Sequence, residues 1–168
     1  MKIGRETVCD LIPHGGLMCL LDEVESWDET HILCLAHSHR SLDNPLRDER
    51  GLAAIHGVEY GAQAMAVHGA LLARRDGRRL GAGYLAALRE VQLRARRLDT
   101  VSGALRVSAH RLLADGGNLM YQIKVADAAS SLLEARVTVV DLSHKTPLGA
   151  CADKRADECV LDLSVRRG

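Results

Sequence analysis

Aromatic side chains are almost absent from this chain of 168 residues, which has no Phe, one Trp and three Tyr. Aromatic rings usually supply much of the area that a core buries, so this core must be built from Leu, Val, Ile and Ala. Hydrophobic residues still make up 47% of the chain, which excludes an intrinsically disordered protein. The length is that of one domain with a sizeable core.

A net charge of one sign is also lacking, because 22 basic and 22 acidic residues cancel. The neutral balance gives no electrostatic reason to expect nucleic acid or a membrane surface as a partner. No apolar run approaches the roughly 20 residues that span a membrane. The first residues lack the apolar stretch and cleavage site of a signal peptide. We therefore expect a cytoplasmic globular protein.

The five cysteines do not predict a disulfide framework. Their number is odd, no two have C-x-x-C spacing, and nothing directs the chain to an oxidising compartment. We interpret Cys9, Cys19 and Cys34 as small buried hydrophobic residues, and Cys151 and Cys159 as exposed thiols near the end of the chain.

The periodicity of apolar residues divides the chain into strands and one helix. Residues 52–75 lack Pro, are rich in Ala, Leu and Met, and predict a helix that ends at the basic and glycine residues 74–77. Segments that predict strands are 20–24, 31–36, 91–95, 101–110, 121–125 and 133–139. The links between the last four are short, so we expect antiparallel neighbours in a domain of residues 1–141. Residues 142–168 lose all periodicity and predict a loosely packed polar tail.

The predicted helix is apolar on nearly all sides, which is typical of a buried helix. Its glycines each cost up to about 1 kcal/mol relative to Ala, unless close packing compensates. We therefore expect an α+β fold in which a strongly curved antiparallel sheet wraps around one central helix. An acyl channel lined by Leu, Val and Met, without bulky rings, would then stay open beside the helix.

Glu59 lies near the start of this helix, on a face with His56 and Gln63. A buried carboxylate without a partner is costly, so such groups shift their pKa, find partners or do chemistry. Alternatively, Glu59 faces water at the start of the helix, where the helix dipole favours an anion. The residues alone leave both interpretations open.

Two segments carry a family resemblance. Residues 11–14 (L-I-P-H), followed by residues 18–24 (M-C-L-L-D-E-V), are similar to L-x-P-H-R-x-P-x-L-L-x-D-x-V. Residues 57–63 (G-V-E-Y-G-A-Q) look like G-x-x-E-x-x-A-Q, with one residue fewer between Gly and Glu. Both motifs belong to the hotdog-fold 3-hydroxyacyl-(acyl carrier protein) dehydratases, and the shortened form resembles a divergent branch found with aryl-polyene-type fatty acid synthesis. The strand order fits over residues 8–141.

The resemblance implies removal of water from a carrier-bound 3-hydroxyacyl thioester. A His with a pKa near 6.5 suits removal of the proton beside the carbonyl, and a carboxyl group suits expulsion of the hydroxyl. Glu59 would be that carboxyl, Gln63 would orient it, and the region of Gly57 would supply N–H donors to the thioester oxygen.

The expected catalytic His is missing from its usual place. In the family it lies fourteen residues before the acidic residue, in a G-H-F-P segment, and Pro45 occupies that position here. The substitutes are His56, one turn from Glu59, and His14 of the opening motif, either of which could act across a dimer interface. His37 and His39 are further substitutes.

The run of Arg74, Arg75, Arg78 and Arg79 is typical of a solvated helix end. By resemblance it would receive an acidic acyl carrier protein. The partner that the resemblance implies is this carrier protein or its acyl-phosphopantetheine arm. We expect no metal or other cofactor, because two histidines spaced as His37-x-His39 are a weak metal signal.

We expect a homodimer, because edge-to-edge pairing of hotdog sheets covers exposed strand edges. Two alternatives to the dehydratase stay open. One is a thioesterase on the same fold, in which Glu59 would activate water. The other is a non-catalytic subunit that forms a heterodimer with another hotdog subunit and positions an active dehydratase.

Overall fold

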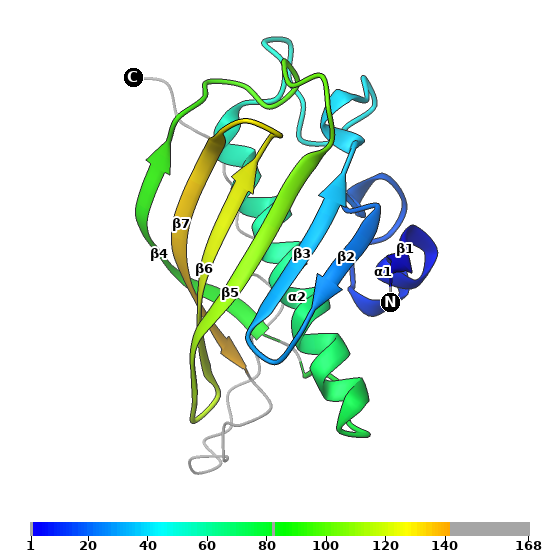
Figure 1. Ribbon diagram of the computed structural model, residues 1–168, viewed down its shortest axis with the longest axis vertical. Coiled ribbons are helices and arrows are strands. Elements are labelled where there is room, and N and C mark those ends of the chain that lie inside the picture. Colours follow the sequence, from blue (N-terminus) through cyan, green and yellow to red (C-terminus); the bar gives the residue numbers. More distant parts are fainter. Residues whose placement is uncertain (1, 82, 142–168) are drawn as a thin grey trace, which may run out of the picture.

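A computed structural model describes residues 2–81 and 83–141 as a seven-stranded antiparallel sheet with one long helix, α2, against it (Figure 1). The sheet order is β1-β2-β3-β5-β6-β7-β4. The elements are β1 Ile3–Gly4, α1 Arg5–Leu11, β2 Glu23–Trp27, β3 His31–Ala36, α2 Gly57–Arg75, β4 Gly83–Leu93, β5 Leu105–Asp115, β6 Asn118–Ala126 and β7 Ser131–Asp141. The predicted polar tail, with Cys151 and Cys159, lies outside the described residues. Among the residues described, no helix is long and apolar enough to cross a membrane.

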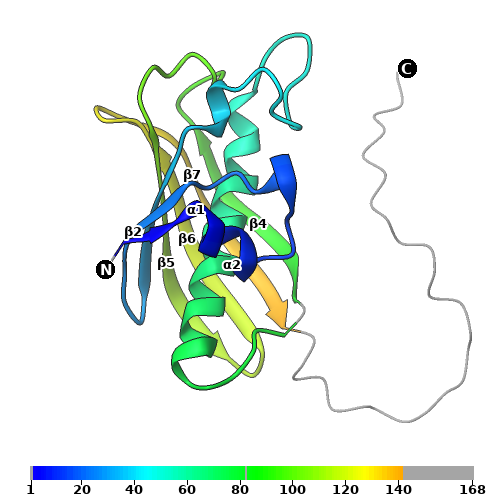
Figure 2. The same ribbon diagram turned by 90° about the vertical axis from the view of Figure 1, so that its right-hand side faces the viewer.

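The sheet curves around α2, which runs along its concave side, and α1 lies against α2 (Figure 2). Glycines of α2 let side chains approach closely. A Cβ on Gly61 would lie 2.5 Å from Cδ1 of Ile123, and a Cβ on Gly57 would lie 3.3 Å from Cδ1 of Leu133. These contacts confirm the predicted architecture and explain why the helix tolerates glycine.

Several element boundaries differ from the prediction. The helix begins at Gly57, because residues 54–56 form a 3₁₀ turn before it. The first predicted strand lies further along, at β2, and the N-terminal β1 and α1 were not expected. β4 begins at Gly83 and is much longer than predicted, because irregularities in its pairing with β7 break the alternation.

The position of β4 corrects the expected strand neighbours. β4 pairs with β7 at the edge of the sheet, whereas the short link after it had predicted pairing with β5. The chain after β4 does not turn back on itself. Instead, it hydrogen-bonds to the segment before α2, from Ala54 N–H to Arg96 O and from Leu98 N–H to Leu52 O. Those contacts lead the chain away from β4 to β5, in the middle of the sheet.

The cysteine prediction is wrong for one pair. Cys9 of α1 and Cys19 form a disulfide, with a sequence separation of 10. Spacing could not reveal this pairing, because α1 itself was not predicted. Cys34 is a buried thiol as expected, and burial raises its pKa to about 12.

Candidate active site

His14 and Glu59 come together from distant parts of the chain. Nε2 of His14 lies 3.3 Å from Oε1 of Glu59, and the two side chains are 34% and 32% exposed. Glu59 is in the first turn of α2. Glu59 is therefore partly open to water near the start of the helix and also has a titratable partner. The sequence had left these two situations as alternatives, and both apply. A proton can pass directly between an imidazole and a carboxyl group in such contact.

Gln63, one turn further along α2, is fully buried and fixes the geometry of this pair. Its Nε2 donates to Oε1 of Glu59 at 3.0 Å and to Met18 O at 2.8 Å. Its Oε1 accepts from Leu20 N–H at 2.9 Å. Because a backbone N–H can only donate and a carbonyl can only accept, these partners define the orientation of the amide. Gln63 thus joins α2 to the chain segment that carries His14.

That segment, residues 12–22, is called the His14 segment below, and further contacts hold it. Arg5 of α1 donates to Cys19 O at 2.6 Å and to Leu21 O at 3.3 Å. Arg5 also forms an ion pair of 2.7 Å with Asp22. Together with the disulfide at Cys19, these contacts tie the His14 segment to α1. The sequence offered no signal for the role of Arg5, because it lies in an unpredicted helix.

Tyr60 anchors the first turn of α2 on another side. Its hydroxyl accepts from Nδ2 of Asn44 at 3.0 Å and lies 2.9 Å from Oγ of Ser38. Ser38 in turn donates to Leu20 O at 2.7 Å. Burial raises the pKa of Tyr60, so this hydroxyl stays protonated at neutral pH. Ser38 and Asn44 are supporting residues that the sequence reasoning missed, since only the fold brings them near the helix.

His14 has an unusual second ring nitrogen. Nδ1 is buried and has no hydrogen-bond partner within the described part of the chain. Because a buried nitrogen is out of reach of a substrate, Nε2 is the nitrogen of His14 that can exchange a proton in the site, and its lone pair can accept one when the ring hydrogen is on Nδ1. His14 therefore offers a candidate base at Nε2, the nitrogen that contacts Glu59.

The other sequence-predicted residues lie elsewhere. His56 is the N-cap residue of α2, and among the described residues its ring forms no hydrogen bond or ion pair with Glu59. The Gly57 N–H donates to the carbonyls of the preceding 3₁₀ turn, Ala54 O and Ile55 O, so it is not available to a substrate. Its Cα instead packs against Leu133.

His37 and His39 are separated by their surroundings. His37 is exposed and pairs with Asp22 at 3.4 Å, whereas His39 is fully buried and contacts Val101 O at 3.2 Å. Burial lowers the pKa of His39, which favours a neutral structural imidazole. Within the residues that the structure describes, neither ring forms a hydrogen bond or ion pair with Glu59.

A cavity of about 450 Å³, called the Glu59 cavity below, opens beside the pair. It runs along α2 past Met65 to Gly69, and its other residues are Pro13, His14, Ala62, Ala66, Leu80, Gly81, Gly83, Tyr84, Leu85, Leu119, Tyr121 and Val139. The lining is mostly apolar, as a channel for an acyl chain requires. The expectation of a channel without bulky rings is wrong, because two of the three tyrosines, Tyr84 and Tyr121, form part of its wall.

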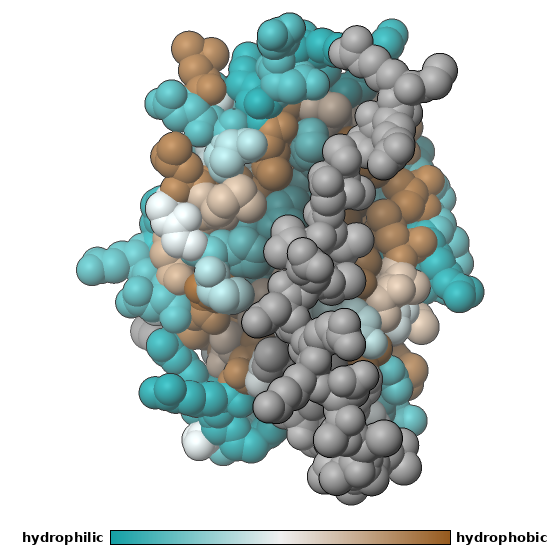
Figure 3. All heavy atoms as spheres, turned by 180° about the vertical axis from the view of Figure 1, so that it is seen from behind, coloured by the Kyte–Doolittle hydropathy of each residue, from teal (hydrophilic) through white to brown (hydrophobic). Residues whose placement is uncertain are grey.

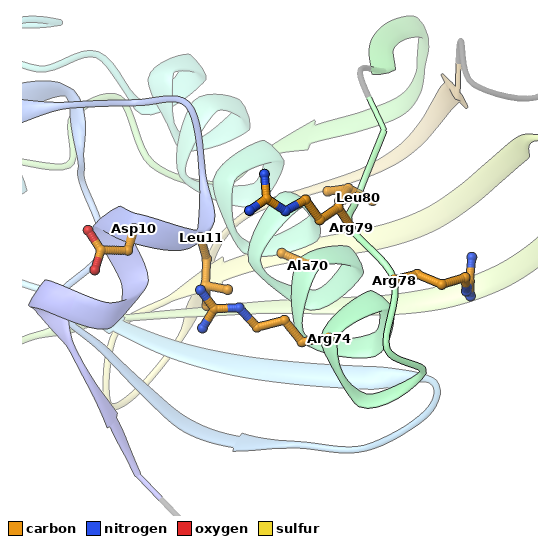
Figure 4. A pocket seen from close by; sticks show the side chains of 7 residues that line it. All are labelled: Asp10, Leu11, Ala70, Arg74, Arg78, Arg79 and Leu80. Atoms are coloured by element: carbon orange, nitrogen blue, oxygen red, sulfur yellow. The ribbon is translucent and has the colours of Figure 1, made fainter.

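The four arginines do not act as one cluster. Arg75 pairs with Glu29 and Asp76, and Arg78 pairs with Asp76 at 2.9 Å. Arg74 and Arg79 line a hollow of about 340 Å³ between α1 and the end of α2, which Arg78 and Asp10 also border. In Figure 4 both of their side chains reach toward Leu11, whereas Arg78 points the other way. Among the described residues, no carboxylate lies within ion-pair distance of either of the two.

Residues 6–148 match the ApeP-like family, described as ApeP dehydratase. The chain belongs to the ApeP-like dehydratase family. The resemblance to dehydratases of aryl-polyene type is thereby confirmed, and the chain is a dehydratase-like protein. The chain has no match among curated proteins.

Solved structures support the hotdog fold of this ApeP-like protein. A chain of the dehydratase heterocomplex ApeI:P from Xenorhabdus doucetiae matches with a TM-score of 0.71 and 21% identity, over 80% of this chain and 90% of that one. AziG of S. sahachiroi matches with a TM-score of 0.53 and 18% identity, over 79% of this chain and 98% of that one. A Staphylococcus aureus thioesterase, SAV0944, matches with a TM-score of 0.53 and 13% identity, over 70% of this chain and 89% of that one. At these identities the likeness concerns the fold alone.

Proposed function

We propose that this protein removes water from a 3-hydroxyacyl thioester, with Glu59 and His14 as the catalytic pair. The observation that carries the proposal is their 3.3 Å contact at the wall of a largely apolar cavity. Gln63 is the positioning residue, because it holds both Glu59 and the backbone of the His14 segment. A thioester's acyl chain would lie along α2.

The reaction balances with these two groups alone. His14 takes the proton from the carbon beside the thioester carbonyl, and the electron pair left on that carbon forms the double bond. The hydroxyl on the next carbon leaves with the proton of Glu59, as water. His14 is then an imidazolium and Glu59 a carboxylate, and transfer of one proton across their contact restores the starting state.

A turnover assay tests this proposal against the thioesterase alternative. The purified protein is given a 3-hydroxyacyl carrier substrate, and loss of water and release of free thiol are both followed. Water loss that Glu59→Gln abolishes supports the dehydratase. Release of thiol would instead support hydrolysis of the thioester, and with it a water-activating role for Glu59. Absence of both products overturns independent catalysis by this chain.

The identity of the base is tested by comparing three histidine variants in the same assay. We expect His14→Ala to lower the rate by about 10² to 10⁴, the usual contribution of a general acid or base. His110, exposed on β5, serves as the control. If His56→Ala rather than His14→Ala stops the reaction, the base is His56 and the geometric assignment fails.

The carrier protein is proposed to contact Arg74 and Arg79. Arg74 and Arg79 line a common hollow and have no ion-pair partner among the described residues. Arg78 also lines that hollow, but Arg78 and Arg75 already pair with acidic neighbours. We expect reversal of charge at Arg74 and Arg79 to weaken binding of an acidic carrier protein strongly at low salt. The matched double reversal at Arg75 and Arg78 should weaken it less. Equal effects would contradict this selection.

A partner subunit is the second candidate function, and the edge strand β4 supports it. Tyr84, Leu85, Val91 and Leu93 of β4 are all exposed, and within the described part of the chain β7 is the one strand beside β4 in the sheet. In Figure 3, hydrophobic surface gathers at the edge where β4 lies. Such an edge favours pairing with another strand. The Xenorhabdus relative is described as part of a dehydratase heterocomplex.

We therefore propose a heterodimer with another hotdog subunit in preference to the homodimer expected from the sequence. Native mass spectrometry of the protein alone, and after co-expression with an ApeI-type subunit, distinguishes the two. A mixed dimer that a Leu85→Glu substitution disrupts supports the proposal. A stable homodimer that excludes the second subunit would contradict it. Activity found only in the mixed dimer would assign this chain a supporting role.

A further inference from the structure

The Glu59 cavity ends beside a second hollow, and the two spaces share part of their lining. Glu59 and Gly69 are ten residues apart on α2, so at about 1.5 Å per residue the cavity extends about 15 Å along the helix. The second hollow has a volume of about 330 Å³. The residues that line both spaces, and so form the wall between them, are Gly69, Leu80, Gly81, Leu119 and Tyr121.

Tyr121 is the fixed part of this wall. It is 1% exposed, and its hydroxyl lies 3.0 Å from Nδ1 of His68, whose ring it meets edge-on. Nε2 of His68 lies 2.9 Å from Asp28 O. Since a carbonyl only accepts, Nε2 carries the hydrogen, and Nδ1 accepts from the Tyr121 hydroxyl. Burial lowers the pKa of His68 and raises that of Tyr121 to about 12, which keeps both groups neutral.

Leu80 is the less firmly packed part. It follows the arginine run, is 41% exposed, and rests on the bare Cα of Gly69, where a Cβ would lie 3.1 Å from its Cδ1. A side chain that is only half covered has fewer packing contacts to restrain it than a fully buried one. Leu80 also borders the hollow of Arg74 and Arg79, so it stands where all three spaces meet.

The two sides of the wall differ in polarity. On the Glu59 side the wall is apolar, whereas the second hollow contains Arg78, Arg79, Arg111 and Asp115. The end of an acyl chain gains from burial among apolar groups, but pushing it among charged groups removes water from them at a cost. An apolar chain that reaches the wall therefore gains nothing by growing further.

We propose that Leu80, resting on Gly69 and backed by the fixed Tyr121, sets the maximum length of the acyl chain that this cavity accepts. This inference rests on the proposed function, since it takes the occupant of the cavity to be the acyl group of a thioester. Leu80 is then a specificity-determining residue, separate from the chemistry at Glu59 and His14.

The test measures binding, so that it does not depend on turnover. Acyl-pantetheine amides, which cannot react, are titrated into the full chain in a series of increasing chain length. For the unmodified protein we expect affinity to rise about fourfold per methylene and then to stop rising at a limiting length. Leu80→Ala should move that limit about three carbons further, the number of carbons removed. Leu80→Phe should shorten it.

Leu113→Ala is the control, because Leu113 is similarly exposed (49%) but lines neither space. The limiting chain length of this variant should equal that of the unmodified protein. If the unmodified protein shows a limiting chain length and Leu80→Ala does not change it, the inference is overturned while the proposed function stands. Absence of any acyl binding by the unmodified protein would overturn both.

Discussion

Substitution of Gln63 by Ala should destabilise the protein and detach the His14 segment from α2. The change leaves the buried Leu20 N–H and the partly buried Met18 carbonyl without their partner. Each orphaned group costs about 1–3 kcal/mol, and water that enters the vacated space recovers part of this. We expect a net loss of about 3 kcal/mol in the free energy of unfolding.

Urea unfolding measures this loss directly. With a slope of about 1–3 kcal/mol per molar urea, the midpoint should fall by about 1–3 M. Gln92→Ala is the matched control, because Gln92 is exposed on β4 and bonds only to Arg94 among the described residues. A loss below about 1 kcal/mol, equal to that of the control, would refute the role given to Gln63.

The nearly isosteric Gln63→Glu separates hydrogen bonding from packing. The new carboxylate would face both Glu59 and the Met18 carbonyl, so the folded state should favour its protonated form. A group with a raised folded pKa contributes stability at low pH that is lost as the pH rises through that pKa. The variant should therefore be closer to the unmodified protein at acidic pH than at neutral pH. An unchanged difference would contradict this network.

Three further outcomes are expected. Gly61→Ala should lower the free energy of unfolding by about 1–3 kcal/mol, because its Cβ would lie 2.5 Å from Cδ1 of Ile123. Adding Ile123→Val to the same chain should restore part of this loss in a thermal unfolding assay. The hydrogen bond from Arg97 lowers the pKa of Asp99 to about 2. Up to about 2 kcal/mol of stability is therefore present above about pH 4 and should be lost as the pH falls toward 2. Asp99→Asn should remove this dependence of stability on pH. Reduction of the disulfide, which closes a loop with a sequence separation of 10, should cost about 3 kcal/mol in urea unfolding.

The central helix and most strands could be predicted because their patterns are local. The glycines of α2 indicated close approach, and Ile123 and Leu133 provide it. β4 was only partly predicted, because bulges between Leu85 and Ala87 and between Arg89 and Gln92 shift the phase of its alternation. Its place beside β7 depends on contacts across the chain, which a short link does not reveal.

The site was predictable only in part for the same reason. Family resemblance singled out Glu59 and Gln63, which share one helix face. The partner of Glu59 could not be chosen from helix geometry, which placed His56 on that face. His14 reaches Glu59 because Arg5, the disulfide and Gln63 together hold its segment against α2. The residues that make these contacts are not spaced in any sequence pattern that predicts their pairing.

The most direct test of the account is a double-mutant cycle on the dehydration rate with His14→Ala and Glu59→Gln. Groups that act as one unit lose most of the rate on the first substitution, so the double variant should be no more than a few-fold slower than either single one. Losses that multiply, or a normal rate in one of the two variants, would show that His14 and Glu59 do not work as the pair that their contact implies.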